Sequence, residues 1–414
     1  MRVLWFSVTP SLYSKNPLYN GGGWIASLEG ELKKNKSIEL GVAFEFCDDK
    51  FKVCENGVTY YPINVWKTKK KLRRREWNIL NEEKYIIPEC IKIIEDFSPD
   101  IIHIFGTEWC FGLIQNYIKI PVIIHLQGSI IAYNRVTFPP GYSVYDKIRD
   151  VFFNLKKQIK LCLDRKNTKV RARREERIFS ISKNFMGRTN WDLGLSKIYS
   201  PNSNYYRCEE MLRPIFYQEP NSWNNFYNGG KLILTTVGGG DLRKGITAIL
   251  ATAKILKEKM NLDFEWRVIG NKGNIKIAEK KERIRHENIC VRLCGVLDAE
   301  EIKQMLLDSH LYVYPSLMDN SPNALCEAQL LGVPCIATYV GGIPSLVTDF
   351  EDGLLVPSND PESLAFCICN LMNDSALAQK LSINGKSRAS KRHNPQQIIN
   401  TLFSIYESLL LDNK

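Results

Sequence analysis

The chain of 414 residues has no apolar run near the roughly 18 residues that a membrane-spanning helix needs. Its twelve cysteines show no paired C-x-x-C spacing, its five histidines have no metal-ligand spacing, and no Asp-x-Asp pair occurs. These absences argue against an integral membrane protein and against the common zinc and disulfide frameworks. Without a repeat, a low-complexity segment or a signal-peptide pattern, the sequence predicts a globular protein kept in the cytoplasm with reduced thiols.

Length and composition are those of two globular domains. With 44% hydrophobic residues, the chain can bury two cores and is too long for one. Its charge is uneven, because residues 1–215 hold 35 Lys and Arg against 23 Asp and Glu, whereas residues 216–414 hold 21 against 22. The excess of positive charge therefore lies in the first half.

Two basic stretches stand out in that half. One runs from Lys67 to Arg75 and is flanked by two tryptophans, and the other spans residues 156–177 in a segment with a helical pattern. Each Lys or Arg near an anionic leaflet contributes about 1 kcal/mol, and tryptophan favours the interface, so the first half predicts a surface for an anionic membrane. A solvated helix face is the alternative. No nucleic-acid partner is expected, because no nucleic-acid motif accompanies the charge.

Apolar strands alternate with amphipathic helical stretches along the chain, which predicts an α/β architecture with parallel sheets. The strands expected in the first half are residues 3–8, 40–46, 101–105, 122–126, 178–181 and a short one near 198. Those expected in the second half are residues 232–237, 265–269, 289–293, 311–314, 335–338 and 353–356. Residues 217–230 are polar and rich in Gly, Pro and Asn, so they are the predicted linker.

The most informative stretch is residues 311–334. It opens with a short aromatic and β-branched run, residues 311–314, which is typical of a strand covered on both faces. The pair Ser321-Pro322 predicts an N-cap followed by the first residue of a helix that runs to about residue 331.

The opening of this helix predicts a binding site for an anion. The backbone N–H groups of Asn323, Ala324 and Leu325 would point out of the carboxyl edge of the sheet, where a diphosphate gains hydrogen bonds and the helix dipole. Asp319 lies in the loop ahead of the helix, and Glu327 lies more than a turn inside it. Ionised carboxylates accept hydrogen bonds from sugar hydroxyls, so the stretch predicts a nucleotide-sugar site.

These residues match a known family. Two acids with seven residues between them, followed by Ala-x-x-x-Gly-x-Pro, resemble the E-x7-E motif of retaining glycosyltransferases of sequence family 4, in the variant typical of bacterial surface-polysaccharide enzymes. The resemblance implies the GT-B fold, in which two Rossmann-like doubly wound α/β domains face a central cleft. It implies an acceptor-binding domain over residues 1–215, a nucleotide-sugar-binding domain over 216–394, and a helix over 395–411 that packs back onto the first domain.

The two acids take their roles from the resemblance. It implies that Asp319 holds hydroxyls of the donor sugar and acts in catalysis, and that Glu327 binds the ribose. Asn320 and Ser321, which follow Asp319 in the sequence, are further predicted donor contacts. The first acid is Asp where the family usually has Glu, so its reach is shorter.

A glycine-rich loop follows the predicted strand at residues 232–237. Its Lys244-Gly245 pair matches the family's Lys-Gly, whose lysine binds the donor diphosphate and is a predicted catalytic residue. Many relatives have an arginine five or six positions earlier, where this chain has glycine. Arg243 either substitutes for that arginine or diverges from Lys244 at the start of a helix.

The first domain offers further candidates for the donor and for catalysis. Gly22 and Gly23 belong to a triple glycine after the first strand, and the resemblance implies that this loop faces the donor phosphate; a flexible turn is the alternative. Gln127 falls where many relatives place a histidine that meets the transferred sugar. A glutamine can hydrogen-bond the sugar but cannot take a proton, so general-base catalysis from this position is not expected.

Three more residues of this domain lie within a predicted strand or just after one. Glu108 lies past the predicted strand at residues 101–105 and is a predicted acceptor contact. His125 is a second predicted acceptor contact, ranked below Gln127. His103 alternates with apolar residues and is predicted to be a core histidine.

The resemblance implies a retaining, metal-independent glycosyltransferase without a cofactor. Its donor would be a nucleoside diphosphate sugar, with a uridine donor expected ahead of a guanosine donor, and its acceptor a lipid-linked or polysaccharide glycan. Two alternatives stay open: an epimerase or phosphorylase on the same scaffold, or a non-catalytic partner protein that binds nucleotide sugars.

Overall fold

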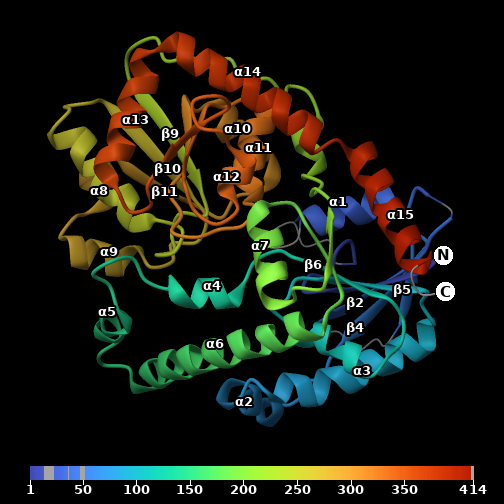
Figure 1. Cartoon of the computed structure of the whole chain (residues 1–414). Helices are drawn as coiled ribbons and strands as arrows, with labels where there is room; N and C mark the ends of the chain where they lie inside the picture. The colour runs from blue at the N-terminus through green and yellow to red at the C-terminus, as the bar shows by residue number, and fades with distance from the viewer. Residues whose placement is uncertain (14–22, 36, 47–51, 412–414) are drawn as a thin grey trace. The chain divides into compact units, whose positions relative to one another are not determined.

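The computed structural model describes residues 1–13, 23–35, 37–46 and 52–411. The chain forms two compact units (Figure 1). Unit 1 consists of Met1–Arg135, Lys156–Met211 and His393–Lys414, and unit 2 of Val136–Leu155 and Leu212–Arg392. The predicted first domain, residues 1–215, is therefore corrected at two places, because residues 136–155 and 212–215 pack with unit 2.

Unit 1 is built on one eight-stranded sheet of order β3-β4-β2-β1-β5-β6-β7-β8, in which only β3 is antiparallel among the described strands. Its strands are β1 (Arg2–Ser7), β2 (Glu39–Glu45), β3 (Val53–Glu55), β4 (Val58–Ile63), β5 (Ile101–Phe105), β6 (Val122–His125), β7 (Asn184–Gly187) and β8 (Asn204–Arg207). Its helices are α1 (Gly23–Leu32), α2 (Lys69–Trp77), α3 (Asn81–Phe97), η1 (Cys110–Asn116), α4 (Ile130–Arg135), α6 (Leu155–Ile181), α7 (Asn190–Tyr199) and α15 (Pro395–Leu411).

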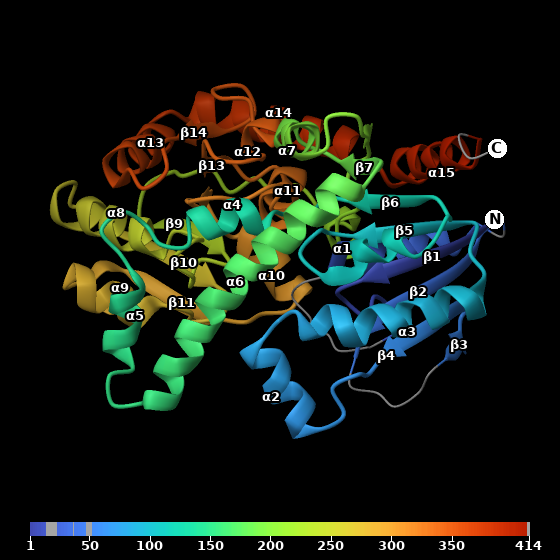
Figure 2. The ribbon, with the colours of Figure 1, turned by 60° about the horizontal axis from the view of Figure 1, so that its bottom comes forward.

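Helices cover both faces of this sheet, because alternate strand side chains point to opposite sides. On β1, Leu4 and Phe6 pack with α3, η1 and α6. Figure 2 shows α3 along this face of the sheet. Val3 and Trp5 pack on the other side with α1 and α15. The four residues in the middle of the strand, 3–6, are therefore all apolar, as expected for a buried parallel strand.

The last helix, α15, is part of the core of unit 1. Tyr406 is fully buried, and its hydroxyl accepts a hydrogen bond from Trp5 Nε1 at 3.1 Å and lies 2.7 Å from His103 Nδ1. Burial lowers the pKa of His103 to about 3. This is the packing that the resemblance implies for the last helix, and His103 is a core residue as predicted.

Part of the positive charge in unit 1 is paired with a buried acid. Glu82 on α3 is 1% exposed and binds Arg174 at 2.8 Å, Arg75 at 2.9 Å and Arg171 at 3.3 Å. Burial acts to raise the pKa of Glu82, but the three guanidinium groups outweigh it and lower the pKa. One member of the basic stretch on α2 and two on α6 thus neutralise a buried acid.

Unit 2 contains a six-stranded parallel sheet of order β11-β10-β9-β12-β13-β14. Its strands are β9 (Leu232–Val237), β10 (Phe264–Ile269), β11 (Val291–Gly295), β12 (Leu311–Tyr314), β13 (Cys335–Thr338) and β14 (Leu354–Val356). Its helices are α5 (Val144–Asp150), η2 (Pro214–Tyr217), α8 (Ile246–Glu258), α9 (Ile275–Glu282), η3 (His286–Ile289), α10 (Ala299–Leu307), α11 (Asn323–Leu331), α12 (Ile343–Leu346), α13 (Pro361–Asn373) and α14 (Ser375–Arg392).

The sheet of unit 2 also lies between two helical layers. Leu311 and Val313 of β12 pack with α8, α9 and α13 on one face, and Tyr312 and Tyr314 pack with α10, α11 and α12 on the other (Figure 1). Because neighbouring strands are parallel, their carboxyl ends lie at the same edge of the sheet. The loops that follow β9, β12 and β13 therefore meet at this edge.

Three predictions about elements are wrong. Residues 178–181 are the end of α6 and the region near 198 lies in α7, whereas the strands there are β7 and β8. The expected linker at residues 217–230 is not a free connection, because Trp223 is buried and its Nε1 donates to the Ser309 carbonyl at 2.6 Å. None of the helices among the described residues combines the length and the hydropathy that a membrane crossing requires.

Candidate functional site

The loop between β12 and α11 is held by the loops that follow β9 and β13. Leu317 N–H donates to the Arg243 carbonyl at 2.8 Å, and Gly342 N–H donates to the Asp319 carbonyl at 3.0 Å. Glycine is required at two of these contacts: a Cβ on Gly245 (φ +89°) would lie 1.9 Å from the Pro315 carbonyl oxygen, and one on Gly341 (φ +53°) would lie 2.0 Å from that of Asp319. The close packing of three backbone loops thus fixes the position of Asp319.

Asp319, Lys244 and Tyr314 form a hydrogen-bonded cluster. Lys244 Nζ and the Tyr314 hydroxyl both donate to Asp319 Oδ2, and the two donors lie 2.7 Å apart. The other carboxylate oxygen accepts the Asn320 N–H at 3.0 Å. Burial acts to raise the pKa of Asp319, but Lys244 and Arg243 outweigh it and lower the pKa, so the carboxylate is ionised beside the lysine.

Arg243 points to the same loop as Lys244. Its Nη1 donates to the Met318 carbonyl at 3.0 Å. The two neighbouring cations therefore reach the same loop. The Arg243 side chain does not diverge from that of Lys244, which was one of the two alternatives for it. The helix α8 begins two residues after Lys244, which leaves both side chains in the loop.

The start of α11 differs from the prediction in its capping. Pro322, not Ser321, is the N-cap, and the Pro322 carbonyl accepts the N–H of Leu325 at 3.0 Å. The expectation that Leu325 presents its N–H to a ligand is therefore wrong. Asn323 and Ala324 are partly exposed, and the Ser321 hydroxyl and Asn323 Oδ1 are buried without a hydrogen-bond partner among the described residues. Such orphaned polar atoms are expected where a ligand supplies the partner.

Glu327 is buried at 1% exposure and pairs with Arg213. Arg213 Nε and Nη2 donate to its two carboxylate oxygens at 2.7 Å each, and the guanidinium lies 4.9 Å from the centre of the Phe216 ring. Burial raises the pKa of Glu327, and the arginine opposes this effect. A carboxylate has about four acceptor sites, so the bidentate pair leaves two of them for ribose hydroxyls.

Tyr314 and Arg213 are site residues that sequence reasoning missed. The motif marks Asp319 and Glu327 but contains no pattern for the groups that hold them. Tyr314 could have been found, because an inward tyrosine at the carboxyl end of a strand needs a partner for its hydroxyl. Arg213 lies 114 residues from Glu327 and carries no local signal.

In unit 1 the predicted residues follow the carboxyl ends of β5 and β6. Glu108 folds back over Gly106, and burial together with the nearby Glu175 raises its pKa to about 7. Gln127 is partly exposed two residues after β6. Gly23 is the first residue of α1, and Gly22 lies outside the described residues.

His125 does not form an acceptor surface in this structure. It is 1% exposed in β6, stacks on His103 with ring centres 5.5 Å apart, and meets the edge of Trp24 at 5.0 Å. Burial keeps its pKa well below the ordinary value, so the ring is neutral. The prediction of an acceptor contact is therefore corrected: His125 is a core residue, because its face of the strand packs under α1.

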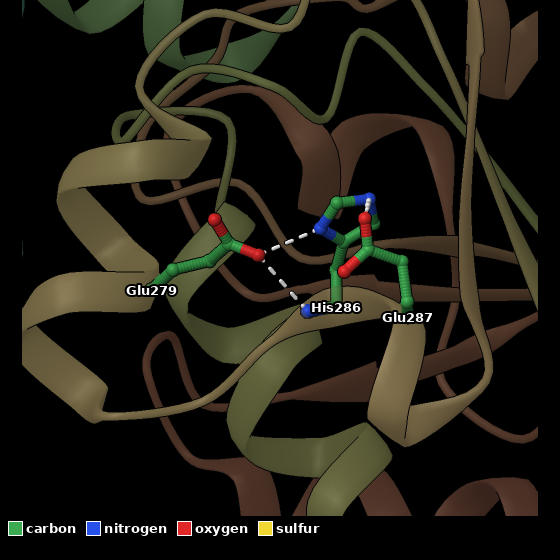
Figure 3. A group of neighbouring side chains, drawn as sticks. All are labelled: Glu279, His286 and Glu287. Atoms are coloured by element: carbon green, nitrogen blue, oxygen red, sulfur yellow. Dashed lines mark hydrogen bonds and ion pairs between the residues drawn. The ribbon is translucent and has the colours of Figure 1, made fainter.

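Among the described residues one group of side chains could reach a metal ion, namely Glu279, His286 and Glu287. Figure 3 shows that the two acids approach different nitrogens of the imidazole: Glu279 Oε1 lies 2.7 Å from Nδ1, and Glu287 Oε1 lies 3.6 Å from Nε2. One ligand atom of each residue lies within 4.8 Å of the others, but the two acids face different nitrogens of the ring. Arg285 also lies 4.0 Å from Glu279. The arrangement is that of a histidine hydrogen-bonded to Glu279.

Comparisons with known proteins agree on the fold. Residues 218–388 match the model of the family Glycosyl transferases group 1. The amylovoran biosynthesis glycosyltransferase AmsK of Erwinia amylovora is 29% identical over 175 residues, which are 40% of this chain and 42% of AmsK, so the match spans less than half of that relative. Sucrose-phosphate synthase from Thermosynechococcus elongatus superposes with a TM-score of 0.73 at 16% identity, covering 99% of both chains.

Anabaena Alr3699/HepE, solved in complex with UDP-glucose, superposes with a TM-score of 0.65 at 12% identity and covers 99% of this chain and 100% of its own. At such identities the likeness shows the fold alone. The two doubly wound parallel sheets and these neighbours show that the chain has the GT-B fold, as predicted.

Proposed function

We propose that this protein is a glycosyltransferase that moves a sugar from a nucleoside diphosphate donor to a lipid-linked or polysaccharide acceptor. The match of residues 218–388 to a glycosyltransferase family and the similarity to AmsK support this class of reaction. The observation that supports it most is the Lys244–Asp319 pair beside the partly exposed first turn of α11.

The donor diphosphate is proposed to bind at the start of α11. The N–H groups of Asn323 and Ala324 would donate to its oxygens, and Lys244 and Arg243 would neutralise its charge. Breaking the bond between sugar and phosphate places negative charge on the diphosphate, and fixed cations aimed at that charge lower the barrier. Lys244 is held in place by Asp319 and Tyr314, so little reorganisation is needed.

The two acids are proposed to position the rest of the donor. Asp319 keeps one acceptor site after its bonds to Lys244, Tyr314 and the Asn320 N–H, which suffices for one sugar hydroxyl. Glu327 is proposed to accept the ribose hydroxyls while Arg213 holds its orientation. The UDP-glucose complex of Alr3699/HepE supports a uridine diphosphate sugar as the first donor to test.

The stereochemistry is proposed to be retaining, without a metal ion, through front-face attack in which the departing phosphate oxygen takes the acceptor proton. Gln127 would bind the sugar and could not act as a base. Acceptor contacts are proposed near Glu108, and the basic surface of unit 1 is proposed to hold the protein at the inner face of an anionic membrane.

The test measures release of the nucleotide from a panel of uridine, guanosine and adenosine diphosphate sugars, with and without glycan acceptors. Nucleotide release that depends on the acceptor, with a glycan product of retained anomeric configuration, is the expected result. Turnover without a glycan product would replace the proposal by an epimerase or phosphorylase, and tight donor binding without turnover would replace it by a non-catalytic binding protein.

A further inference from the structure

The carboxylate of Glu175 links two loops of unit 1. Glu175 lies on α6 and is 0% exposed. Its Oε1 accepts a hydrogen bond from the Thr107 hydroxyl at 2.5 Å, in the loop that follows β5. Its Oε2 accepts from the Ser129 hydroxyl at 2.9 Å, in the loop that follows β6, and from the Ile131 N–H at 2.7 Å, in the first turn of α4. One side chain on a helix therefore ties together the loops at the carboxyl ends of two neighbouring strands.

These two loops carry predicted contacts of unit 1. Glu108 follows Thr107 directly, and Gln127 lies two residues before Ser129. Thr107 and Ser129 are 1% and 0% exposed, so water does not compete for their bonds to Glu175. A shift of the Glu175 carboxylate would therefore reach Glu108 and Gln127 through the short stretches of backbone between them.

Further contacts hold the same loops. The residue before Glu175 on α6, Arg174, donates through Nη2 to the Glu108 carbonyl at 3.0 Å. A Cβ on Gly128 would lie 2.5 Å from the Tyr133 hydroxyl, so the loop packs closely against α4 at the residue after Gln127. The loops are thus built to have one position relative to each other.

The chemistry of Glu175 favours a role in positioning over a role in packing. Among the described residues no cation pairs with it. Burial raises the pKa of Glu175, and its hydrogen bonds oppose this effect. A buried carboxylate without an ion pair costs folding free energy, and an apolar side chain of similar length would fill the space at a lower cost. What the carboxylate offers in return is an acceptor for three donors on two loops, each in a fixed direction.

We propose that Glu175 is a positioning residue that fixes the loop of Gln127 against the loop of Glu108 and so orients the Gln127 amide toward the transferred sugar. This inference rests on the proposed function, in which Gln127 binds that sugar. Glu175 does not touch the substrate and acts through Gln127. Such a support matters to the rate, because a displacement of ~1 Å in a reacting geometry can cost about 100-fold.

The test is a double-mutant cycle between Glu175 and Gln127. Turnover is measured at saturating acceptor, with the donor and glycan acceptor of the panel described above that the wild type turns over fastest. Glu175→Met keeps the length of the side chain and removes all three acceptor contacts. It should lower kcat at least about tenfold and leave the KM for the donor within about twofold, because the donor diphosphate and ribose are assigned to unit 2. Added to Gln127→Ala, it should lower kcat by no more than about twofold further.

The conservative variant Glu175→Gln should rescue the reaction. Its amide oxygen can accept from Ser129 and Ile131, and its amide nitrogen can donate to the Thr107 hydroxyl, so kcat should stay within about threefold of the wild type. Hydrogen exchange checks the contact without any substrate. The Ile131 amide should exchange faster in Glu175→Met than in the wild type, and at close to the wild-type rate in Glu175→Gln.

A control and a milder variant separate positioning from stability. Glu279→Met is the matched control, because Glu279 in unit 2 is 8% exposed and its Oε1 accepts the His286 N–H at 3.0 Å. This control should lower Tm and leave kcat per folded molecule unchanged. Ser129→Ala removes one of the three contacts and should lower kcat at least about threefold, which keeps the test decisive if Glu175→Met does not fold.

Three results would overturn the inference: a Glu175→Met variant with the kcat of the wild type, two substitutions whose effects multiply in the double variant, or a Glu175→Gln variant as slow as Glu175→Met. A role in folding alone would give a lower Tm with the first or second of these results. Failure of the proposed function looks different, because the wild type itself would then show no acceptor-dependent release of nucleotide from any donor, and the role of Glu175 in transfer would fall with it. A wild type that turns donors over beside an unaffected Glu175→Met variant would overturn the inference alone.

Discussion

Replacing Arg213 by alanine should destabilise unit 2 strongly, because it leaves the carboxylate of Glu327 buried and without its partner. Removing one partner of a buried ion pair costs about 3–5 kcal/mol. Since 27% of the Arg213 side chain is exposed and 2% of Glu327, we expect the lower end of that range, about 3 kcal/mol. For a unit of about 200 residues this corresponds to a fall in Tm of roughly 6–12 °C.

The assay is thermal unfolding of the two proteins at neutral pH, with Arg267→Ala as the matched control. Arg267 also donates to a glutamate at 2.7 Å in unit 2, but its partner Glu265 is 26% exposed. A pair of this kind contributes about 0–1 kcal/mol, so the control should lose little. An equal fall in Tm for both variants would refute the argument that burial makes the Arg213–Glu327 pair more important for stability than the Arg267–Glu265 pair.

A double variant separates the structural role of the pair from its role in binding. Arg213→Met with Glu327→Leu should recover most of the lost stability, since apolar replacements of a buried ion pair are often neutral. It should not recover affinity for a nucleoside diphosphate sugar, because no carboxylate remains for the ribose. Full donor affinity in this variant would remove Glu327 from the site.

Three further predictions concern both units. Lys244→Met should lower Tm, because it leaves the buried Asp319 without its ion-pair partner, and should reduce turnover by far more than the fraction of protein that unfolds at the assay temperature. The exposed Lys231→Met should change neither; steady-state rates and melting curves check this. Tyr406→Phe should cost about 1–3 kcal/mol in unfolding free energy, since two buried ring nitrogens lose their partner, and Tyr117→Phe, 68% exposed, should cost little. Burial raises the pKa of Glu108 to about 7, so the folded state loses stability as pH rises through 7. Between pH ~5 and ~8 the Tm of Glu108→Gln should therefore fall less than that of the wild type. A larger fall would contradict the raised pKa of Glu108.

The sequence predicts the strands whose apolar runs are bounded by turn residues. Residues 101–105, 232–237, 311–314 and 335–338 have in the structure the bounds predicted for them. The run at residues 178–181 is misleading because Ile178 and Phe179 are the buried face at the end of a long helix. A short apolar run does not distinguish a strand from such a face.

The candidate site is predictable in its motif and not in its contacts. The motif with seven residues between two acids identifies Asp319 and Glu327, and both are buried in unit 2. The groups that hold them, Tyr314 and Arg213, depend on tertiary packing that no local pattern encodes. Capping by Ser321 fails for a local reason: Pro322 takes the N-cap position itself, which places the serine hydroxyl one residue too early.

The insertion of residues 136–155 into unit 2 is another tertiary effect. Tyr142 donates to Glu282 at 2.6 Å, and Lys280 and Lys281 on α9 bind Asp150 at 2.5 Å and Asp146 at 3.1 Å. These partners lie more than 120 residues apart, so the pairing leaves no periodicity in the sequence.

The most direct test of the donor site is a crystal structure of the protein with a uridine diphosphate sugar. We expect diphosphate oxygens to lie within hydrogen-bond distance of the N–H groups of Asn323 and Ala324 and of Lys244 Nζ, with ribose hydroxyls on Glu327. A nucleotide bound elsewhere, with the first turn of α11 still open to solvent, would contradict it.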